Sequence, residues 1–197
     1  MISRITKEIN EFLNFFVTYL PGSSGNILRR LLYKVLLKSL GKKLSTEIGF
    51  RLTCSKNIII GNNASFMRNC SLNSCEGKIN IGNNISVNQN VDINASAGGF
   101  IKIGNDVLIG NNVVIRAANH IYNNNNNKKI NQSGHKGGRI IIGNNVWIGA
   151  NCVILNNVTL KDGSVIGAGT VVKRNVNSNE IAISSKQINK KYLKIKL

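Results

Sequence analysis

Residues 142–172 read IGNNVWIGANCVILNNVTLKDGSVIGAGTVV, and a large apolar residue returns at every sixth position of this stretch. The phrase Ile-Gly-Asn-Asn that opens it also occurs at 60–63, 81–84 and 109–112. Fifteen positions belong to the same series: Ile60, Phe66, Leu72, Ile81, Val87, Ile93, Ile103, Ile109, Ile115, Ile142, Ile148, Ile154, Leu160, Ile166 and Val172. A helix repeats about every 3.6 residues and a simple strand about every two, so neither explains a period of six.

A second series lies four residues after the first, and its members are mostly small or β-branched. They are Ala64, Cys70, Val91, Ala97, Val107, Val113, Val146, Cys152, Val158, Ser164, Thr170 and Val176. One large and one small inward position per hexapeptide is typical of short strands joined by tight turns, and three such sides make a triangular rung of about eighteen residues. Gly and Asn at the turns adopt the left-handed backbone conformation that other residues resist. The repeats therefore predict a mainly β solenoid.

The interruptions of the series indicate where inserted residues leave the solenoid. The series breaks after 77, 98 and 120, each time after three complete hexapeptides. Insertions at 78–80, 99–102 and 121–141 are therefore expected to leave at one corner of the prism. An irregular rung is expected near 42–59, where Ile48 and Gly49 keep the phase, which brings the total to about five to six rungs.

This pattern resembles the hexapeptide-repeat acyltransferases of the left-handed parallel β-helix type over roughly 48–177. The strongest stretches, 146–150 and 165–172, resemble the C-terminal signature of the galactoside, maltose and surface-polysaccharide acetyltransferases. Handedness is implied by the resemblance alone, since parallel crossovers elsewhere are nearly always right-handed. The resemblance also implies a homotrimer with acetyl-CoA as co-substrate, a saccharide as acceptor and no metal.

The chain divides into three predicted parts. Residues 1–43 are an amphipathic helical segment, with helices expected at 2–20 and 26–40; residues 44–180 are the β-helix acetyltransferase domain with its excursion loop 121–141; residues 181–197 are a basic tail. The two ends hold 13 of the 26 basic residues of a chain whose net charge is +18.

Two interpretations of the N-terminal helices stay open. One is a cap on the first rung, which solenoids need. The other is a basic amphipathic surface, including Arg29, Arg30, Lys34 and Lys38, that touches an anionic membrane. The sequence Leu-Pro-Gly at 20–22, followed by Leu-Arg-Arg at 28–30, resembles the start of acetyltransferases that act on lipopolysaccharide or capsule. Nucleic acid is not an expected partner, because the chain shows no recognisable nucleic-acid-binding module.

His120 is the candidate general base, because it ends its rung at the corner where the long loop leaves. Acyl transfer to an alcohol needs a base for the hydroxyl proton and donors for the oxyanion, and an imidazole suits the first task at neutral pH. The spacing from Ile103 to His120 also resembles that of the family's catalytic histidine. Asn90 resembles the family's acceptor-site asparagine, although a solvated turn would also explain it. His135 is expected to be a flexible, exposed side chain, with contact to substrate or coenzyme A as the alternative.

Seven residues are candidates for binding coenzyme A. Gly149, Ala150, Gly167 and Ala168 match positions where the pantetheine arm approaches the backbone, although tight rung packing also explains small residues there. Lys173 and Arg174 resemble the family's phosphate-side basic pair. Trp147 resembles a tryptophan beside the coenzyme groove, with packing at a subunit interface as the alternative.

The predicted activity is acetyl-CoA-dependent O-acetylation of a sugar hydroxyl, in a bacterial surface polysaccharide or its precursor. N-acetylation of an amino-sugar nucleotide and acetylation of an antibiotic are the alternatives on the same fold. A γ-type carbonic anhydrase needs three zinc histidines and the chain has two. A non-catalytic scaffold is the contrasting class of protein, but it would not need a histidine at the position of the family's catalytic histidine, where His120 lies.

The four cysteines show neither a disulfide framework nor a Cys-x-x-Cys pair. Cys70 and Cys152 fall at small inward positions, so free, buried and reduced thiols are expected. Reduced thiols favour a cytoplasmic location, with the inner membrane face as the second site if the helices touch lipid.

Overall fold

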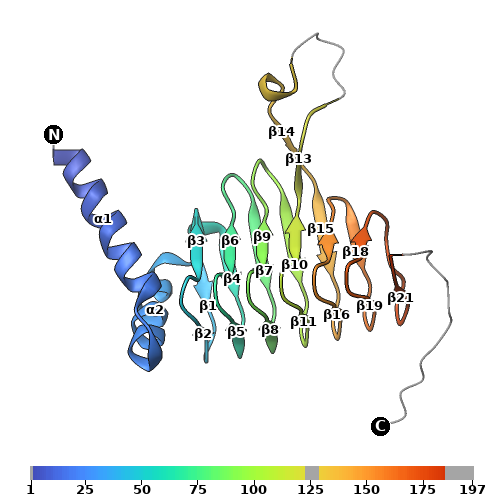
Figure 1. Ribbon diagram of the computed structural model, residues 1–197, viewed down its shortest axis with the longest axis horizontal. Helices are drawn as coiled ribbons and strands as arrows, with labels where there is room; N and C mark the ends of the chain where they lie inside the picture. The colour runs from blue at the N-terminus through green and yellow to red at the C-terminus, as the bar shows by residue number, and fades with distance from the viewer. Residues whose placement is uncertain (1, 123–128, 185–197) are drawn as a thin grey trace.

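The computed structural model describes residues 2–122 and 129–184, which form two helices followed by a parallel β-solenoid (Figure 1). The solenoid is mainly β and consistent with the predicted left-handed parallel β-helix. The first sheet stacks β1 (Ser39–Leu40), β4 (Ile58–Ile60), β7 (Lys78–Ile81), β10 (Phe100–Ile103), β15 (Arg139–Ile142) and β18 (Val158–Leu160). The second stacks β2 (Ser45–Thr46), β5 (Ala64–Phe66), β8 (Ile85–Val87), β11 (Leu108–Ile109), β16 (Trp147–Ile148), β19 (Val165–Ile166) and β21 (Ile181–Ala182). The third stacks β3 (Arg51–Thr53), β6 (Ser71–Asn73), β9 (Asp92–Asn94), β12 (Val114–Arg116), β17 (Val153–Ile154) and β20 (Val171–Val172).

The six-residue series forms the core of the prism. All fifteen of its members are at most 3% exposed. Equivalent residues of successive rungs stack in register, as Ile81 on Ile103 and Ile103 on Ile142 show. The small series is also buried, except Ala97, which lies at a corner with a positive φ of 53°. The period of six therefore reports burial inside the solenoid, as predicted.

Asparagine ladders run along two corners of the solenoid. Asn69, Asn90, Asn112 and Asn151 all have φ near +60°, and each side chain donates to the next along the axis at 3.0–3.3 Å. Asn combines tolerance of this conformation with an amide that can both donate and accept. The abundance of Asn at the turns is thus structural.

The extra residues of the longer rungs fall at one corner, between the third and first sheets, as predicted. The chain leaves the rungs earlier than predicted, however. Lys78 pairs with Phe100, and Phe100 with Arg139, so the residues just before each expected strand join the first sheet. Residues 74–77 and 95–99 make the turns in their place. Main-chain hydrogen bonding, which a side-chain pattern does not report, sets these boundaries.

Helices α1 (Ile2–Tyr19) and α2 (Gly22–Leu36) precede the solenoid. The second helix begins earlier than predicted, directly after its N-cap Pro21. It also ends earlier, because Ser39–Leu40 already pair with β4 as the first strand. The irregular first rung accordingly spans β1 to β3. Tyr33 of α2 packs edge-on against Phe50, and its hydroxyl donates to the Phe50 carbonyl at 3.0 Å. Among the described helices none is long and apolar enough to cross a membrane.

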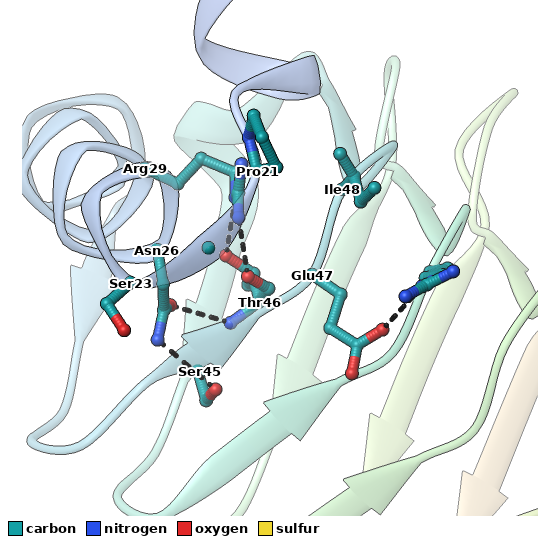
Figure 2. A pocket seen from close by; sticks show the side chains of 10 residues that line it. Pro21, Ser23, Asn26, Arg29, Ser45, Thr46, Glu47 and Ile48 are labelled. Atoms are coloured by element: carbon teal, nitrogen blue, oxygen red, sulfur yellow. Dashed lines mark hydrogen bonds and ion pairs between the residues drawn. The ribbon is translucent and has the colours of Figure 1, made fainter.

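Arg29 ties both helices to the first rung (Figure 2). One interpretation placed Arg29 on an exposed basic surface, but the residue is only 1% exposed. It donates to the carbonyls of Val17 and Leu20 at the end of α1, at 3.0 and 2.8 Å, and to the Thr46 carbonyl of β2 at 2.9 Å. A cation at a helix C-terminus donates to carbonyls that have no intrahelical partner, and its charge interacts favourably with the negative end of the helix dipole. Gly25 is required here, because a Cβ would lie 1.9 Å from the Leu20 carbonyl oxygen.

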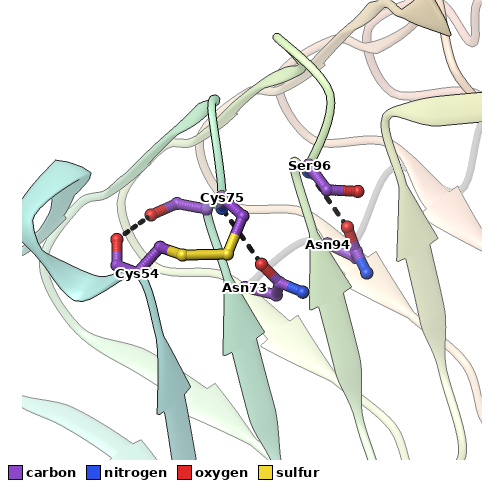
Figure 3. The surroundings of a disulfide bond; sticks show 6 residues. Cys54, Asn73, Cys75, Asn94 and Ser96 are labelled. Carbon is purple, nitrogen blue, oxygen red and sulfur yellow. Dashed lines mark hydrogen bonds between the residues drawn. A yellow bond between two sulfur atoms is a disulfide. The ribbon is translucent and has the colours of Figure 1, made fainter. Parts of the chain in front are cut away.

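The expectation that the cysteines form no disulfide framework is wrong for Cys54 and Cys75. Cys54 and Cys75 form a disulfide that joins the turn after β3 to the turn after β6 (Figure 3). Cys70 and Cys152 are free and buried, as predicted, and burial raises the pKa of both thiols. The expectation of a cytoplasmic location therefore loses part of its support from cysteine chemistry.

Candidate active site

The long excursion begins as a two-stranded ribbon that projects from the body of the solenoid (Figure 1). Strands β13 (Ala118–His120) and β14 (His135–Gly137) are antiparallel, and a 3-10 turn at Ile130–Gln132 precedes β14. Ala118 is buried at the base of the ribbon, and Gly137 fits only without a Cβ, which would lie 2.4 Å from the Ala97 carbonyl oxygen. The base of the ribbon is therefore packed on the rung below it.

His120 lies directly opposite His135 on this ribbon. The two ring centroids are 3.9 Å apart, the rings are tilted by 40°, and both side chains are exposed. Asn119, between Ala118 and His120, donates its Nδ2 to Asn156 Oδ1 of the next rung at 3.0 Å. The structure thus holds the predicted base on a braced strand with an exposed ring.

Asn90 lies at a different corner, between β8 and β9. Its Nδ2 donates to Asn112 Oδ1 at 3.1 Å, and its Oδ1 accepts from Asn69 at 3.3 Å. A side of the prism separates this corner from the one where His120 leaves. One protomer therefore does not bring the two predicted catalytic residues together.

Four coenzyme candidates share the corner of Asn90. Gly149 and Ala150 follow β16, and Gly167 and Ala168 follow β19 on the next rung. The Gly149 amide donates to the Ile166 carbonyl at 2.7 Å, and a Cβ on Gly149 would lie 2.7 Å from the Ala168 nitrogen. Rung packing is therefore sufficient to explain Gly149. Trp147 stands on β16 with 55% of its surface exposed.

Lys173 and Arg174 share the corner of His120, two rungs further along. Both are exposed and line a pocket of about 350 Å³ together with Thr170, Val171, Ile183 and Ser184. A pocket with apolar walls and two cations suits an anionic group on an organic ligand. The predicted residues consequently form two sets, one on each of two corners of the same protomer.

Two features were missed by sequence reasoning. His135 was expected to be flexible, but it stacks on His120; only the ribbon register reveals this. A polar pocket of about 380 Å³ lies between α2 and β2, lined by residues including Ser23, Asn26 and Glu47 (Figure 2). The Leu-Pro-Gly and Leu-Arg-Arg sequences, which supply some of its lining residues, were the only sequence feature noted at this pocket.

Comparison with known proteins places this geometry in context. Residues 139–174 match the bacterial transferase hexapeptide (six repeats) family model. No protein of curated function matches the sequence. The solved structures similar to the chain include the maltose O-acetyltransferase of Clostridium difficile 630, with 26% identity over 90% of this chain and 80% of that one, and a TM-score of 0.60.

Two further solved structures carry coenzyme A. A galactoside acetyltransferase in complex with coenzyme A is 26% identical over 88% of this chain and 74% of that one, with a TM-score of 0.60. The N-acyltransferase AntD of Bacillus cereus, in complex with dTDP-4-amino-4,6-dideoxyglucose and coenzyme A, is 24% identical over 85% and 91% of the two chains, with a TM-score of 0.72. At that identity the likeness to AntD shows the fold alone.

Proposed function

We propose that the chain is a hexapeptide-repeat acyltransferase and that it transfers an acetyl group from acetyl-CoA to a sugar hydroxyl. The acceptor that we propose is a bacterial surface polysaccharide or its precursor. The observation that carries the proposal is the exposed His120 imidazole on a packed ribbon of a solenoid that resembles sugar O-acetyltransferases.

His120 is the proposed general base for direct transfer. It takes the proton of the acceptor hydroxyl while that oxygen attacks the thioester carbonyl, and a C–O bond forms. The tetrahedral intermediate then collapses, the C–S bond breaks, and the leaving sulfur takes the proton from the imidazolium. The products are the acetyl ester and coenzyme A. No covalent enzyme intermediate is needed, which agrees with the burial of the two free thiols.

A homotrimer is the proposed assembly, because the candidate residues lie on two corners of one protomer. If the His120 corner faces the Asn90 corner of a neighbour, a single cleft holds both. Asn90 would then fix the acceptor hydroxyl or donate to the oxyanion. The ladder uses one N–H and one lone pair of this amide, so the second N–H would serve the ligand without breaking the ladder.

The same arrangement divides the coenzyme between two protomers. We assign the phosphates to Lys173 and Arg174, whose pocket carries the matching charge. Trp147, Gly149, Ala150, Gly167 and Ala168 would line the pantetheine arm on the facing corner. Guanidinium and ammonium groups bind phosphate through charge-assisted hydrogen bonds. Because acetyl-CoA is made and used in the cytoplasm, that is the proposed location.

N-acetylation of an amino-sugar nucleotide is the second candidate. The fold of AntD, whose structure holds a dTDP-amino sugar, aligns with 85% of this chain. An amine acceptor would use the same exposed base to accept its proton. The two reactions differ in the acceptor pocket, which one protomer does not complete.

The test of the proposal is acetyl-CoA consumption measured against three acceptor sets: free saccharides, lipid-linked glycans and amino-sugar nucleotides. Release of the coenzyme A thiol, with mass spectrometry of the product, reports both turnover and the modified atom. Ester formation on a saccharide is expected. Amide formation would favour the second candidate, and the lack of turnover with every set would refute acetyl transfer to these acceptors.

A further inference from the structure

Helix α2 buries one side against the solenoid and carries an apolar stripe on another side that the solenoid does not cover. Arg29 and Tyr33 are buried against the first rung. Ile27, Leu31 and Val35 recur at every fourth residue on another face, and Val35 is 82% exposed. Amphipathic surface helices usually turn their other face to solvent with polar residues. A second apolar stripe therefore requires an explanation beyond capping.

Helix α1 adds to the same kind of surface. Phe12, Phe15, Phe16 and Tyr19 share one side of its C-terminal half, and Phe12 is 70% exposed. We define the helical apolar face as the nine exposed large apolar residues of both helices: Phe12, Leu13, Phe15, Phe16, Tyr19, Ile27, Leu28, Leu31 and Val35. Large apolar side chains exposed together on two packed helices are typical of an interaction surface in a folded protein.

Hydrogen bonds between the helices and the first rung fix the position of the helical apolar face. Arg29 binds the C-terminal carbonyls of α1 and the Thr46 carbonyl of β2 at the same time. Thr46 in turn donates its amide to the Asn26 side chain of α2 at 3.0 Å. These bonds hold α1 where Figure 1 shows it, pointing away from the end of the solenoid. The fold thus presents the helical apolar face at one end of the molecule.

The charges beside the face identify what it fits. Arg30 and Lys34 flank the α2 stripe, and Lys38, Lys42 and Lys43 follow; all five are exposed. Residues 12–46 contain no Asp or Glu, and Glu8 and Glu11 precede the apolar stripe of α1 in sequence. Every copy of the chain carries the same cations, so a second copy docked on this face would bring more positive charge to it. Phospholipid headgroups supply the opposite charge, and acyl chains accept the apolar side chains.

We propose that the helical apolar face docks on the surface of an anionic phospholipid bilayer. The helices lie on the bilayer without crossing it, and the solenoid stays outside. Docking does not depend on the chemistry. Its use to the enzyme, which is to lie beside acceptors carried on lipid, rests on the proposed function. A trimer would present three such faces and bind by avidity.

Vesicle sedimentation of the full chain tests the proposal. The probes are phosphatidylcholine vesicles with and without about 30% phosphatidylglycerol, at low and high salt. One variant carries Arg30→Glu and Lys34→Glu. Its matched control carries Lys78→Glu and Lys102→Glu, which make the same charge change at exposed positions of the first sheet. A second variant carries Phe16→Ser and Leu31→Ser, with Met67→Ser as its exposed apolar control.

Binding of wild type is expected only to the anionic vesicles and to weaken with salt. Reversal of Arg30 and Lys34 should lower the partition coefficient about 20-fold or more, and the control pair much less. The apolar variant should also lose binding, whereas Met67→Ser should not. Equal partitioning of the helix variants and their controls would overturn the proposal. So would loss of self-association in the apolar variant, measured by sedimentation equilibrium, together with unchanged vesicle binding, because the face would then join copies of the chain.

Two readouts keep docking separate from acetyl transfer. Thermal unfolding shows that each variant is folded, and calorimetric titration measures acetyl-CoA binding. The helix variants should bind acetyl-CoA as wild type does. If wild type binds vesicles but not acetyl-CoA, the proposed function fails while docking stands; the reverse result leaves acetyl transfer intact and overturns docking.

Discussion

His120 and His135 face each other across the β13–β14 ribbon, with ring centroids 3.9 Å apart. Directly opposite residues of an antiparallel pair restrict each other's side-chain rotamers. The ring of His135 therefore limits the orientations open to the proposed base. An exposed histidine on a single strand would have no such restriction.

This relationship predicts a positioning role for His135. Replacement by Ala should lower kcat about 2- to 10-fold with little change in KM, because an aromatic pair contributes about 0.5–1.5 kcal/mol. His135→Phe keeps a ring at the position and should retain most of kcat. Steady-state kinetics of the two variants decide the matter; equal losses in both would mean that stacking does not position His120.

The pocket beside β20 predicts a defect specific to the coenzyme. Lys173→Ala with Arg174→Ala should raise KM for acetyl-CoA about 10-fold or more and change kcat little, since hydrogen bonds between charged groups contribute about 1.5–3 kcal/mol each. Lys102→Ala, on the first sheet, is the control for loss of positive charge. A fall in kcat at unchanged KM would place the phosphates elsewhere.

The asparagine ladder allows a matched test of Asn90. Asn69 and Asn90 have the same φ of 59° and neighbouring places in one ladder. Glycine tolerates that conformation, so Asn69→Gly and Asn90→Gly should lose similar, small amounts of stability. Only Asn90→Gly should lower kcat, by about 10²-fold, if its amide serves the reaction. Equal activities would assign Asn90 to the turn alone.

The disulfide predicts sensitivity to reduction. Cys54 and Cys75 are 21 residues apart in sequence, and closing a loop of that size stabilises a fold by about 3 kcal/mol in the chain-entropy account. Dithiothreitol should lower the Tm of wild type, and a variant with Cys54→Ser and Cys75→Ser should have the lower Tm already and show no further response. A wild-type Tm that dithiothreitol does not change would show that the bond contributes nothing.

The fold could be predicted from the sequence because each hexapeptide buries one large apolar residue. Buried residues therefore recur at a fixed spacing of six along the chain. Ile60, Ile81, Ile103 and Ile142 share a column of the first sheet, as the spacing required. The corner of the insertions followed from the same count. Strand ends did not, because residues such as Lys78 and Arg139 join the sheet through main-chain bonds.

Features that depend on strand register or on long-range packing could not be predicted from the sequence. The pairing of Cys54 with Cys75 arises from an irregular rung whose length no repeat reports. Arg29 belongs to a basic stretch by sequence, and only the end of α1 explains its burial. His120 was placed correctly at the corner of the excursion, whereas its partner His135 depends on where the ribbon strands meet.

The central claim is that His120 is the general base, and the activity of His120→Ala tests it most directly. The side chain is exposed, so the variant should unfold at nearly the wild-type temperature. With the acceptor found in the screen, acetyl transfer should fall about 10²- to 10⁴-fold, while Lys136→Ala, next to His135 on the same ribbon, should remain active. Transfer by His120→Ala at the wild-type rate would contradict the account.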